Sequence, residues 1–341
     1  MKICIISGHY KPNKCGISDY VTLLSTELER QGHDVIKITL SESQSLVFIA
    51  KSLPSADIYS FQFAPYMFSP KGLIGNSLLY FAKSLKDKKN HINFHEIWIG
   101  AYPKASMKER LIGWRQKREI IKFLNLTKPY SITCSNAASL DRLKSANIKA
   151  DYLYLFGNIP FSQSDGKRIK NLIKVAIFGT PYDKFPYDLL FRKLHEFSDI
   201  ENKRIELKII GRQRESKGLA LIKNLSQKFK CSICEYGEQS TESISHQLQS
   251  CDLGICTTPY DILGKSGTTA AMLEHGLPVV AFDDGDTNED KLFIINEFEE
   301  QIFLLNVKSS VTRLSYYMKK ERKPFFDGVV HTAKEMLNLL N

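Results

Sequence analysis

Short apolar runs alternate with longer amphipathic stretches along almost the whole chain. This alternation is typical of parallel sheets whose strands are joined by helical crossovers. The first half is predicted to contain strands at residues 2–7, 35–40, 57–63, 92–99, 130–135 and 152–156. The second half is predicted to contain strands at 172–179, 204–211, 252–257 and 277–282, and helices at 216–229, 241–250 and 266–275.

A polar segment from Phe161 to Asn171 interrupts the alternation and is the best candidate for an interdomain linker. We therefore expect an α/β protein with two doubly wound, Rossmann-like domains at residues 1–160 and 172–341, joined by residues 161–171. For the last helix of the chain, packing back on the N-terminal domain is an alternative. Because ligands bind at the carboxyl ends of parallel strands, the cleft between the halves is the expected site.

The composition narrows the class of partner. The 341 residues carry 47 Lys and Arg against 37 Asp and Glu, a net charge of +10, which favours an anionic partner. The lysines are dispersed, so we expect no dedicated nucleic-acid-binding arm. The first residues lack the pattern of a signal peptide, and no apolar run is long enough to span a bilayer. Seven scattered cysteines suit reduced thiols, so we expect a cytoplasmic protein.

One pair of cysteines, Cys231 and Cys234, has the C-x-x-C spacing of metal and redox sites. No second pair and no histidine pattern accompanies it. We interpret the pair as coincidental, and we predict no metal site and no cofactor.

The loop after the first predicted strand carries Gly8 and Gly16, and Ser18 and Asp19 lie at the start of the helix that follows. Glycines let a backbone approach a ligand closely. Asp19 is a candidate general base, and Gly16 a candidate ligand contact. An ordinary loop, with a carboxylate that complements the helix dipole, would explain the same residues.

At the end of the fourth predicted strand, His95 and Glu96 are candidate catalytic residues, with Trp98 as a stacking surface. A buried structural histidine beside a solvent-facing glutamate is the alternative. The stretch from Lys104 to Lys128 interleaves basic and apolar residues. It suits either an anionic membrane surface or a helix packed on its own domain with a solvated basic face.

The segment at 261–281, DILGKSGTTAAMLEHGLPVVA, is the most informative in the chain. Lys265 to Thr269 opens what reads as a helix, and Gly276 to Val280 closes it and starts a strand. A helix N-terminus with free N–H groups, hydroxyls and an adjacent lysine suits a phosphate. The segment is not a P-loop, because the glycine spacing and the GK[ST] order are absent. The candidate donor and diphosphate residues here and at nearby strand ends are Lys184, Arg212, Asp261, Lys265, Ser266, Gly267 and Thr268.

The order of these residues resembles GT-B glycosyltransferases, nearest to the retaining family 4 group. The resemblance rests on CGISDYVTLLSTELERQGHDV, His95, the IFG and IIG strand ends, and CDLGICTTP followed by KSGTTAAMLEHGLPVVA. It implies the GT-B fold, an acceptor-binding N-terminal domain and a nucleotide-sugar-binding C-terminal domain. It also implies that His95 contacts the donor sugar and that the backbone at 265–269 meets the diphosphate.

Two features depart from the family pattern. The positions of the family's paired glutamates fall on Ile262 and Ala270, and that of its diphosphate arginine on Thr180. Either Asp261, Arg212 and Lys265 substitute for the missing groups, or the chain has its own donor geometry. The expected function is transfer of a sugar from a nucleotide diphosphate sugar to a hydroxyl of a cell-envelope glycan or lipid-linked saccharide. A nucleotide-sugar epimerase and a catalytically silent nucleotide- or sugar-binding protein are the alternatives.

Overall fold

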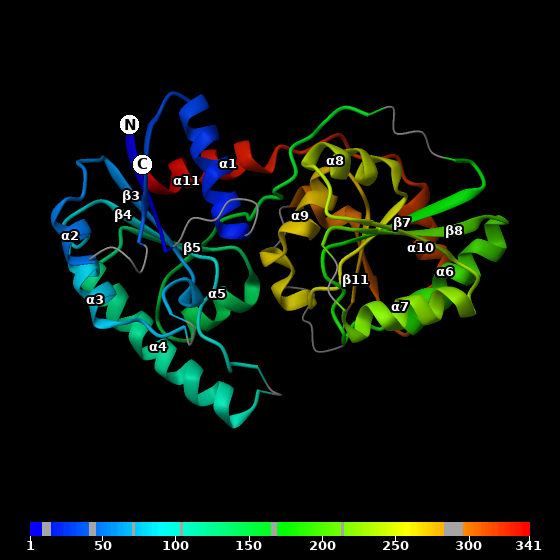
Figure 1. The fold of residues 1–341 in the computed structure, drawn as a ribbon, viewed down its shortest axis with the longest axis horizontal. Helices are drawn as coiled ribbons and strands as arrows, with labels where there is room; N and C mark the ends of the chain where they lie inside the picture. The colour runs from blue at the N-terminus through cyan, green and yellow to red at the C-terminus, as the bar shows by residue number, and fades with distance from the viewer. Residues whose placement is uncertain are drawn as a thin grey trace. The chain divides into compact units, whose positions relative to one another are not determined.

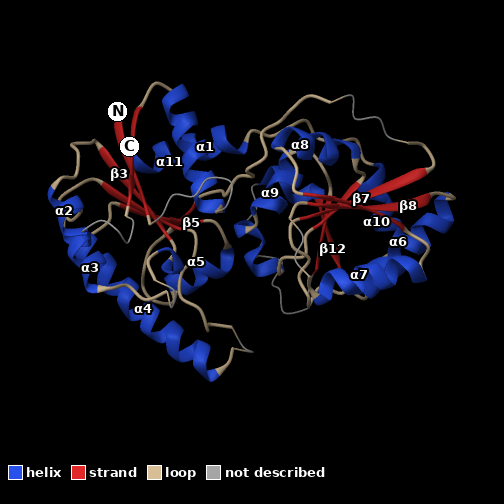
Figure 2. Cartoon of the chain, in the orientation of Figure 1, coloured by secondary structure: helices blue, strands red, loops and turns tan. Residues whose placement is uncertain are grey.

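Parallel strands joined by helices form two separate sheets in the computed structural model (Figures 1 and 2). The structure describes residues 1–8, 15–40, 46–69, 72–102, 105–164, 169–212, 215–282 and 296–341. The chain divides into two compact units. The first comprises Met1–Tyr154 and Val329–Asn341, and the second Leu155–Gly328. The last helix, α11 (Gly328–Leu340), thus contributes all but its first residue to the first unit.

The first unit contains a six-stranded sheet of order β2-β1-β3-β4-β5-β6. One face is apolar: Phe61 and Phe63 of β3 pack against Phe123, and Phe61 also contacts Phe81. The elements of this unit are β1 (Lys2–Ser7), α1 (Gly16–Arg30), β2 (Asp34–Thr39), α2 (Leu46–Lys51), β3 (Ile58–Phe63), η1 (Pro65–Met67), α3 (Asn76–Lys83), β4 (Asn90–Phe94), α4 (Met107–Thr127), β5 (Ser131–Cys134), α5 (Ala137–Lys144) and β6 (Asp151–Tyr152).

The second unit contains a six-stranded sheet of order β12-β11-β10-β7-β8-β9. Counted from β7, this is the 3-2-1-4-5-6 order of dinucleotide-binding domains, and it reverses between β7 and β10. The elements are β7 (Leu172–Phe178), α6 (Tyr187–Glu201), β8 (Arg204–Ile210), α7 (Lys217–Lys228), β9 (Ser232–Gly237), α8 (Thr241–Ser250), β10 (Leu253–Ile255), η2 (Tyr260–Lys265), α9 (Gly267–Glu274), β11 (Val279–Phe282), η4 (Asn296–Gln301), β12 (Ile302–Leu305) and α10 (Val311–Lys319).

The predicted alternation is confirmed, with two strands missed and several drawn too long, those at 92–99 and 152–156 by the most. The strands at 92–99 and 152–156 end earlier, at Phe94 and Tyr152. Apolar residues stay buried beyond these ends, Trp98 among them, so the apolar pattern could not mark where hydrogen bonding stops. The missed strands, β9 and β12, are the two edges of the second sheet. The sequence of β9, SICEYG, mixes charged and apolar residues, as suits an edge strand whose outer side no strand of the described ranges pairs with.

Within the described ranges, no helix combines the length and the apolar composition that crossing a membrane requires.

Candidate functional site

Glycines with positive φ angles form part of the carboxyl edge of the second sheet. Gly179 follows β7 with φ +88°, Gly211 follows β8 with φ +98°, and Gly237 ends β9 with φ +64°. The Gly179 N–H donates to the Ile210 carbonyl at 3.0 Å, and the Gly211 N–H to the Gly237 carbonyl at 2.9 Å. Glycine adopts such angles without the steric cost that a Cβ adds. This edge is therefore lined by backbone, where a ligand can approach closely.

Helix α9 begins at this edge, between the ends of β7 and β10. A Cβ added to Gly179 would lie 3.1 Å from Cγ2 of Thr268, and Oγ1 of Thr269 lies 3.0 Å from Sγ of Cys256. Because the strand order reverses between β7 and β10, the N-terminus of α9 lies at the topological switch point of the sheet. Ligands of doubly wound sheets bind at such points.

Hydroxyl groups cap the start of α9. Oγ of Ser266 accepts from the Thr269 N–H at 3.3 Å and from Oγ1 of Thr269 at 2.8 Å, and it lies 3.2 Å from Oγ1 of Thr268. A Cβ added to Gly267, the first residue of the helix, would meet no atom of the other described residues within 4 Å. Within the described part of the chain, open space thus lies beside the positive end of the helix dipole, an arrangement suited to an anion.

Two predicted lysines belong to this unit. Lys265 is exposed and ends η2, directly before the cap at Ser266. Lys184 is exposed in the connection between β7 and α6. The structure therefore brings Lys265, Ser266, Gly267 and Thr268 together at one helix start. The side chain of Asp261 lies outside the described residues.

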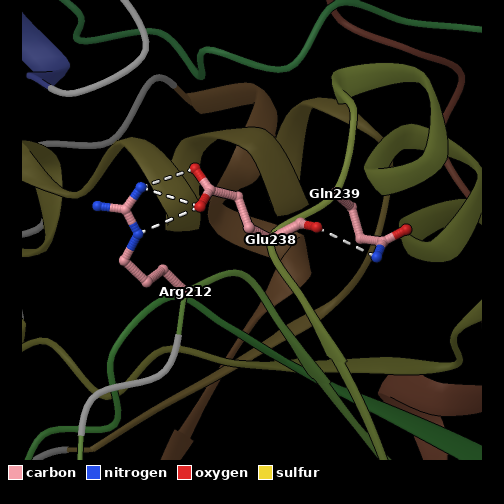
Figure 3. Close-up of polar contacts among 3 residues, drawn as sticks. All are labelled: Arg212, Glu238 and Gln239. Carbon is pink, nitrogen blue, oxygen red and sulfur yellow. Dashed lines mark hydrogen bonds and ion pairs between the residues drawn. The ribbon is translucent and has the colours of Figure 1, made fainter.

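Arg212 follows Gly211 at the end of β8, where its guanidinium pairs with Glu238, the residue after β9 (Figure 3). Nη2 of Arg212 lies 2.8 and 2.9 Å from the two carboxylate oxygens, and Nε lies 3.3 Å from Oε2. Both side chains are more than half exposed. Glu238 was not predicted, although a carboxylate directly after a strand-ending glycine mirrors the Gly211–Arg212 pair on the neighbouring strand.

A buried carboxylate ends α9. Glu274 is 2% exposed, and its Oε1 accepts from the Gly157 N–H at 2.9 Å. A Cβ on Gly157 would lie 2.6 Å from the backbone of Ala271, so only glycine fits against the helix there. Glu274 thus fastens the segment after residue 154 to α9, which explains its presence without a role in chemistry.

In the first unit, His95 directly follows β4 and is 7% exposed. Its backbone N–H donates to the Phe63 carbonyl at 2.9 Å, and its Nε2 lies 2.8 Å from Oε1 of Gln62. An amide oxygen only accepts, so Nε2 carries the proton and Nδ1 is the unprotonated nitrogen. Burial lowers the pKa of His95 to about 4, so the imidazole is neutral at pH 7.

The Gln62 side chain belongs to a closed ring of buried hydrogen bonds on the polar face of the first sheet. The ring comprises Gln62, Ser60, His91, Thr133 and Asn93. In that order each side chain donates to the next, and Asn93 returns to Gln62, with separations of 2.8 to 3.0 Å. Because the Ser60 hydroxyl accepts from Gln62 and the Thr133 hydroxyl donates to Asn93, His91 accepts at Nδ1 and donates from Nε2. Burial, and next the charge of His95, lowers the pKa of His91 to about 3.

This ring was not predicted, although the sequence carries a signal for it. Ser60 and Gln62 alternate with apolar residues in β3, and so do His91 and Asn93 in β4. Such a period of two places polar groups on one face of each strand. Register pairs Ser60 with His91 and Gln62 with Asn93, so both polar faces coincide.

The other predicted residues of the first unit are less enclosed. Glu96 and Asp19 are half-buried, and Gly16 is exposed at the first residue of α1, where a Cβ would meet no atom of the other described residues within 4 Å. The loop at 9–14 lies outside the described residues. The expectation that Trp98 offers a stacking surface was wrong. Its ring is 5% exposed, because it packs in the core beneath Lys117.

Cysteines form no metal site in the part of the chain that the structure describes. No group of three or more His, Cys, Asp and Glu side chains is placed there to hold an ion. All seven thiols are free, and Cys231 precedes the strand that contains Cys234. Burial raises the pKa of Cys231 to about 11, so this thiol is not a reactive thiolate.

Comparison with known proteins identifies the architecture. No protein-family model matches the sequence. No curated protein matches it either. Sucrose-phosphate synthase from Thermosynechococcus elongatus superposes on 100% of this chain and 96% of its own, with a TM-score of 0.60 and 12% identity. The chain has the GT-B fold.

Two further solved structures are similar over nearly their whole length. Anabaena HepE, in complex with UDP and glucose, gives a TM-score of 0.57 at 12% identity over 100% of this chain and 96% of its own. UDP-GlcNAc 2-epimerase from Methanocaldococcus jannaschii gives 0.54 at 13% identity, over 100% and 99%. At such identities the likeness establishes the GT-B fold of this chain.

Proposed function

We propose that the protein is a glycosyltransferase that uses a nucleotide diphosphate sugar. The observation that carries the proposal is the position of the α9 N-terminus at the switch point between β7 and β10, beside the positive-φ Gly179. Anabaena HepE, which has the same fold, is described in complex with UDP and glucose, and this supports a uridine donor.

The second unit would stabilise the leaving diphosphate. Negative charge grows on the diphosphate as the glycosidic bond breaks. The backbone N–H groups at Gly267 and Thr268 and the ammonium of Lys265 are the groups that we assign to it. This assignment involves no metal ion and no cofactor.

The acceptor in our proposal is a hydroxyl of a cell-envelope glycan or lipid-linked saccharide, and the compartment is the cytoplasm. His95, neutral and with Nδ1 unprotonated, would accept a hydrogen bond from a sugar hydroxyl while Gln62 fixes its ring. Glu96 and Asp19 are the further candidates for the acceptor side. The resemblance to family 4 supports a hexosyl transfer, with Ile262 and Ala270 in place of the family's paired glutamates.

Thermal shift with nucleoside diphosphates tests the donor site, because a ligand that binds only the folded state raises the melting temperature. We expect UDP to raise it in the wild type and Lys265→Ala to weaken UDP binding several-fold. Arg204→Ala is the matched control. It also removes one exposed positive charge from the second unit, but at the first residue of β8, on the opposite edge of the sheet. Equal affinity of both variants for UDP would contradict the assignment.

The similarity to UDP-GlcNAc 2-epimerase supports epimerisation as a second candidate. Incubation of UDP-sugars without an acceptor separates the two reactions. Epimerisation converts the sugar under these conditions, whereas transfer requires an acceptor from a glycan and lipid-linked panel. UDP binding without turnover in either assay would identify a binding protein and contradict both.

A further inference from the structure

Helix α4 presents two contrasting faces. Its inner face is buried and includes Gly113, Gln116, Ile120, Phe123 and Leu124. A Cβ on Gly113 would collide with the Ile99 carbonyl, so the helix presses directly on the 99–100 backbone. The inner face is thus fully used in the packing of the first unit, and the question is what the outer face contacts.

The outer face begins with three large apolar side chains that are exposed. Met107 is 83%, Leu111 68% and Trp114 55% exposed. Their spacing of four and three residues places them in one row over the first two turns of the helix. In Figure 1 these turns form the end of α4 farthest from the sheet of the first unit. An exposed apolar row of this kind marks an interaction surface.

Basic residues continue the row and flank it. Arg118 and Lys122, both exposed, follow Trp114 at intervals of four residues, and the Arg118 guanidinium lies 4.7 Å from the centroid of the Trp114 ring. The helix carries six basic residues, Lys108, Arg110, Arg115, Lys117, Arg118 and Lys122, and two acidic ones, Glu109 and Glu119.

Both acidic side chains form hydrogen bonds with other groups of the protein. Glu109 forms the capping box with Ser106, and Glu119 accepts from the Ile74 N–H and from Arg115. The outer face therefore combines apolar and cationic groups, which complements an anionic surface.

We propose that the outer face of α4, defined by Met107, Leu111, Trp114, Arg118 and Lys122, binds an anionic lipid bilayer. A helix lying in the bilayer interface inserts apolar side chains to the level of the headgroups while Lys and Arg contact lipid phosphates. Tryptophan favours this depth, because its ring is apolar and its N–H is polar. Three side chains expose on the order of a few hundred Å², less than the ~800 Å² per partner of a stable protein complex. This proposal does not depend on the proposed function.

Sedimentation with vesicles tests the surface. We expect the protein to bind vesicles of phosphatidylcholine and phosphatidylglycerol at 7:3, and to bind pure phosphatidylcholine at least tenfold more weakly. The triple variant Met107→Ser, Leu111→Ser, Trp114→Ser should bind the anionic vesicles at least tenfold more weakly than the wild type, and Arg118→Gln with Lys122→Gln several-fold more weakly. The control is Ile200→Ser with Val307→Ser, which removes apolar side chains 67% and 86% exposed in the second unit and should bind as the wild type.

Fluorescence gives a second readout, because the protein has two tryptophans and only Trp114 is exposed. We expect anionic vesicles to shift the emission to shorter wavelength, and Trp114→Phe to abolish the shift. Unchanged vesicle binding by the triple variant would overturn the proposal. So would concentration-dependent dimerisation through α4 without vesicle binding, because the occupant would then be a second copy of the chain.

Discussion

The carboxyl ends of the strands, here called the edge of each sheet, are lined by different groups in the two units. In the first unit, side chains form the edge: His95 is held by Gln62, which belongs to a closed ring of buried hydrogen bonds. In the second unit, backbone forms it: Gly179 and Gly211 carry no side chain, and the N-terminus of α9 lies beside them, with space around Gly267 among the described residues. A side-chain network fixes one neutral histidine in one orientation, whereas glycines beside a helix N-terminus are an arrangement suited to a charged ligand. The difference suits an edge that orients a hydroxyl and another that binds a diphosphate.

The largest difference between the two edges is expected on acidification, which should lower the stability of the edge that contains the buried histidines. Burial holds the pKa of His95 at about 4 and that of His91 at about 3, below the unfolded value of 6.5. Between pH 6.5 and 4 the unfolded chain thus binds protons that the folded chain does not, so the free energy of unfolding falls as the pH falls. We expect a loss of about 2 kcal/mol per histidine between pH 7 and pH 5. Hydrogen exchange of peptides from β3 and β4 measures it.

His91→Gln provides the comparison for this experiment, because glutamine cannot titrate. It should be less stable than the wild type at pH 7 but lose less stability on acidification. His195→Gln is the control, since that ring is about half exposed in the second unit. If His91→Gln and the wild type lose stability equally, buried neutral histidines are not the cause.

Breaking the ring at neutral pH should be the next largest effect. Asn93→Leu removes the partner of Gln62 and Thr133 and leaves both buried, at a cost of about 3 kcal/mol in the free energy of unfolding. Urea unfolding measures the change. The control Asn338→Leu makes the same substitution at an exposed site of the same unit. A loss below about 1 kcal/mol for Asn93→Leu would show that the ring does not hold the first edge together.

The backbone edge predicts an effect on binding. Gly179→Ala places a Cβ 3.1 Å from Cγ2 of Thr268, at the start of α9, so UDP affinity should fall at least tenfold. Gly237→Ala has the same kind of positive φ, but its Cβ would meet no atom of the other described residues within 4 Å. Both should lose about 1 kcal/mol of stability from the backbone angle. Isothermal calorimetry with UDP should separate them, and an equal loss of affinity would move the ligand away from α9.

More of the groups at the carboxyl edge of the second sheet than of the first could be predicted from the sequence. The start of α9 could be predicted because the lysine, the capping serine and the small residues are adjacent in the chain, from Lys265 to Thr268. The partners of His95 lie on other strands, and only pairing in register brings Gln62 and Asn93 together. For the same reason the Glu238 partner of Arg212 was missed. Edge strand β9 was overlooked because half-exposed strands lack a continuous apolar run.

The ion pair of Arg212 with Glu238 allows the finest test of the backbone edge. An exposed pair contributes at most about 1 kcal/mol to stability, so Glu238→Gln should leave the melting temperature almost unchanged. If Arg212 turns to the diphosphate when the donor binds, Glu238 competes for the same guanidinium. Glu238→Gln should then tighten UDP binding about twofold to fivefold, within the energy of such a pair. Arg212→Gln should weaken it, since a bidentate cation is lost.

Titration calorimetry of both variants decides between two roles for Arg212. The control is Glu235→Gln, which removes the carboxylate of another exposed pair on the same strand, that with Lys223. Weaker UDP binding in Glu238→Gln would mean that the pair itself shapes the edge, as a fixed brace between β8 and β9. Tighter UDP binding by Glu238→Gln, with no change in Glu235→Gln, would mean that Glu238 holds the Arg212 guanidinium until the diphosphate binds. Arg212 would then resemble His95 of the first unit, because a side chain from a neighbouring strand positions each of them.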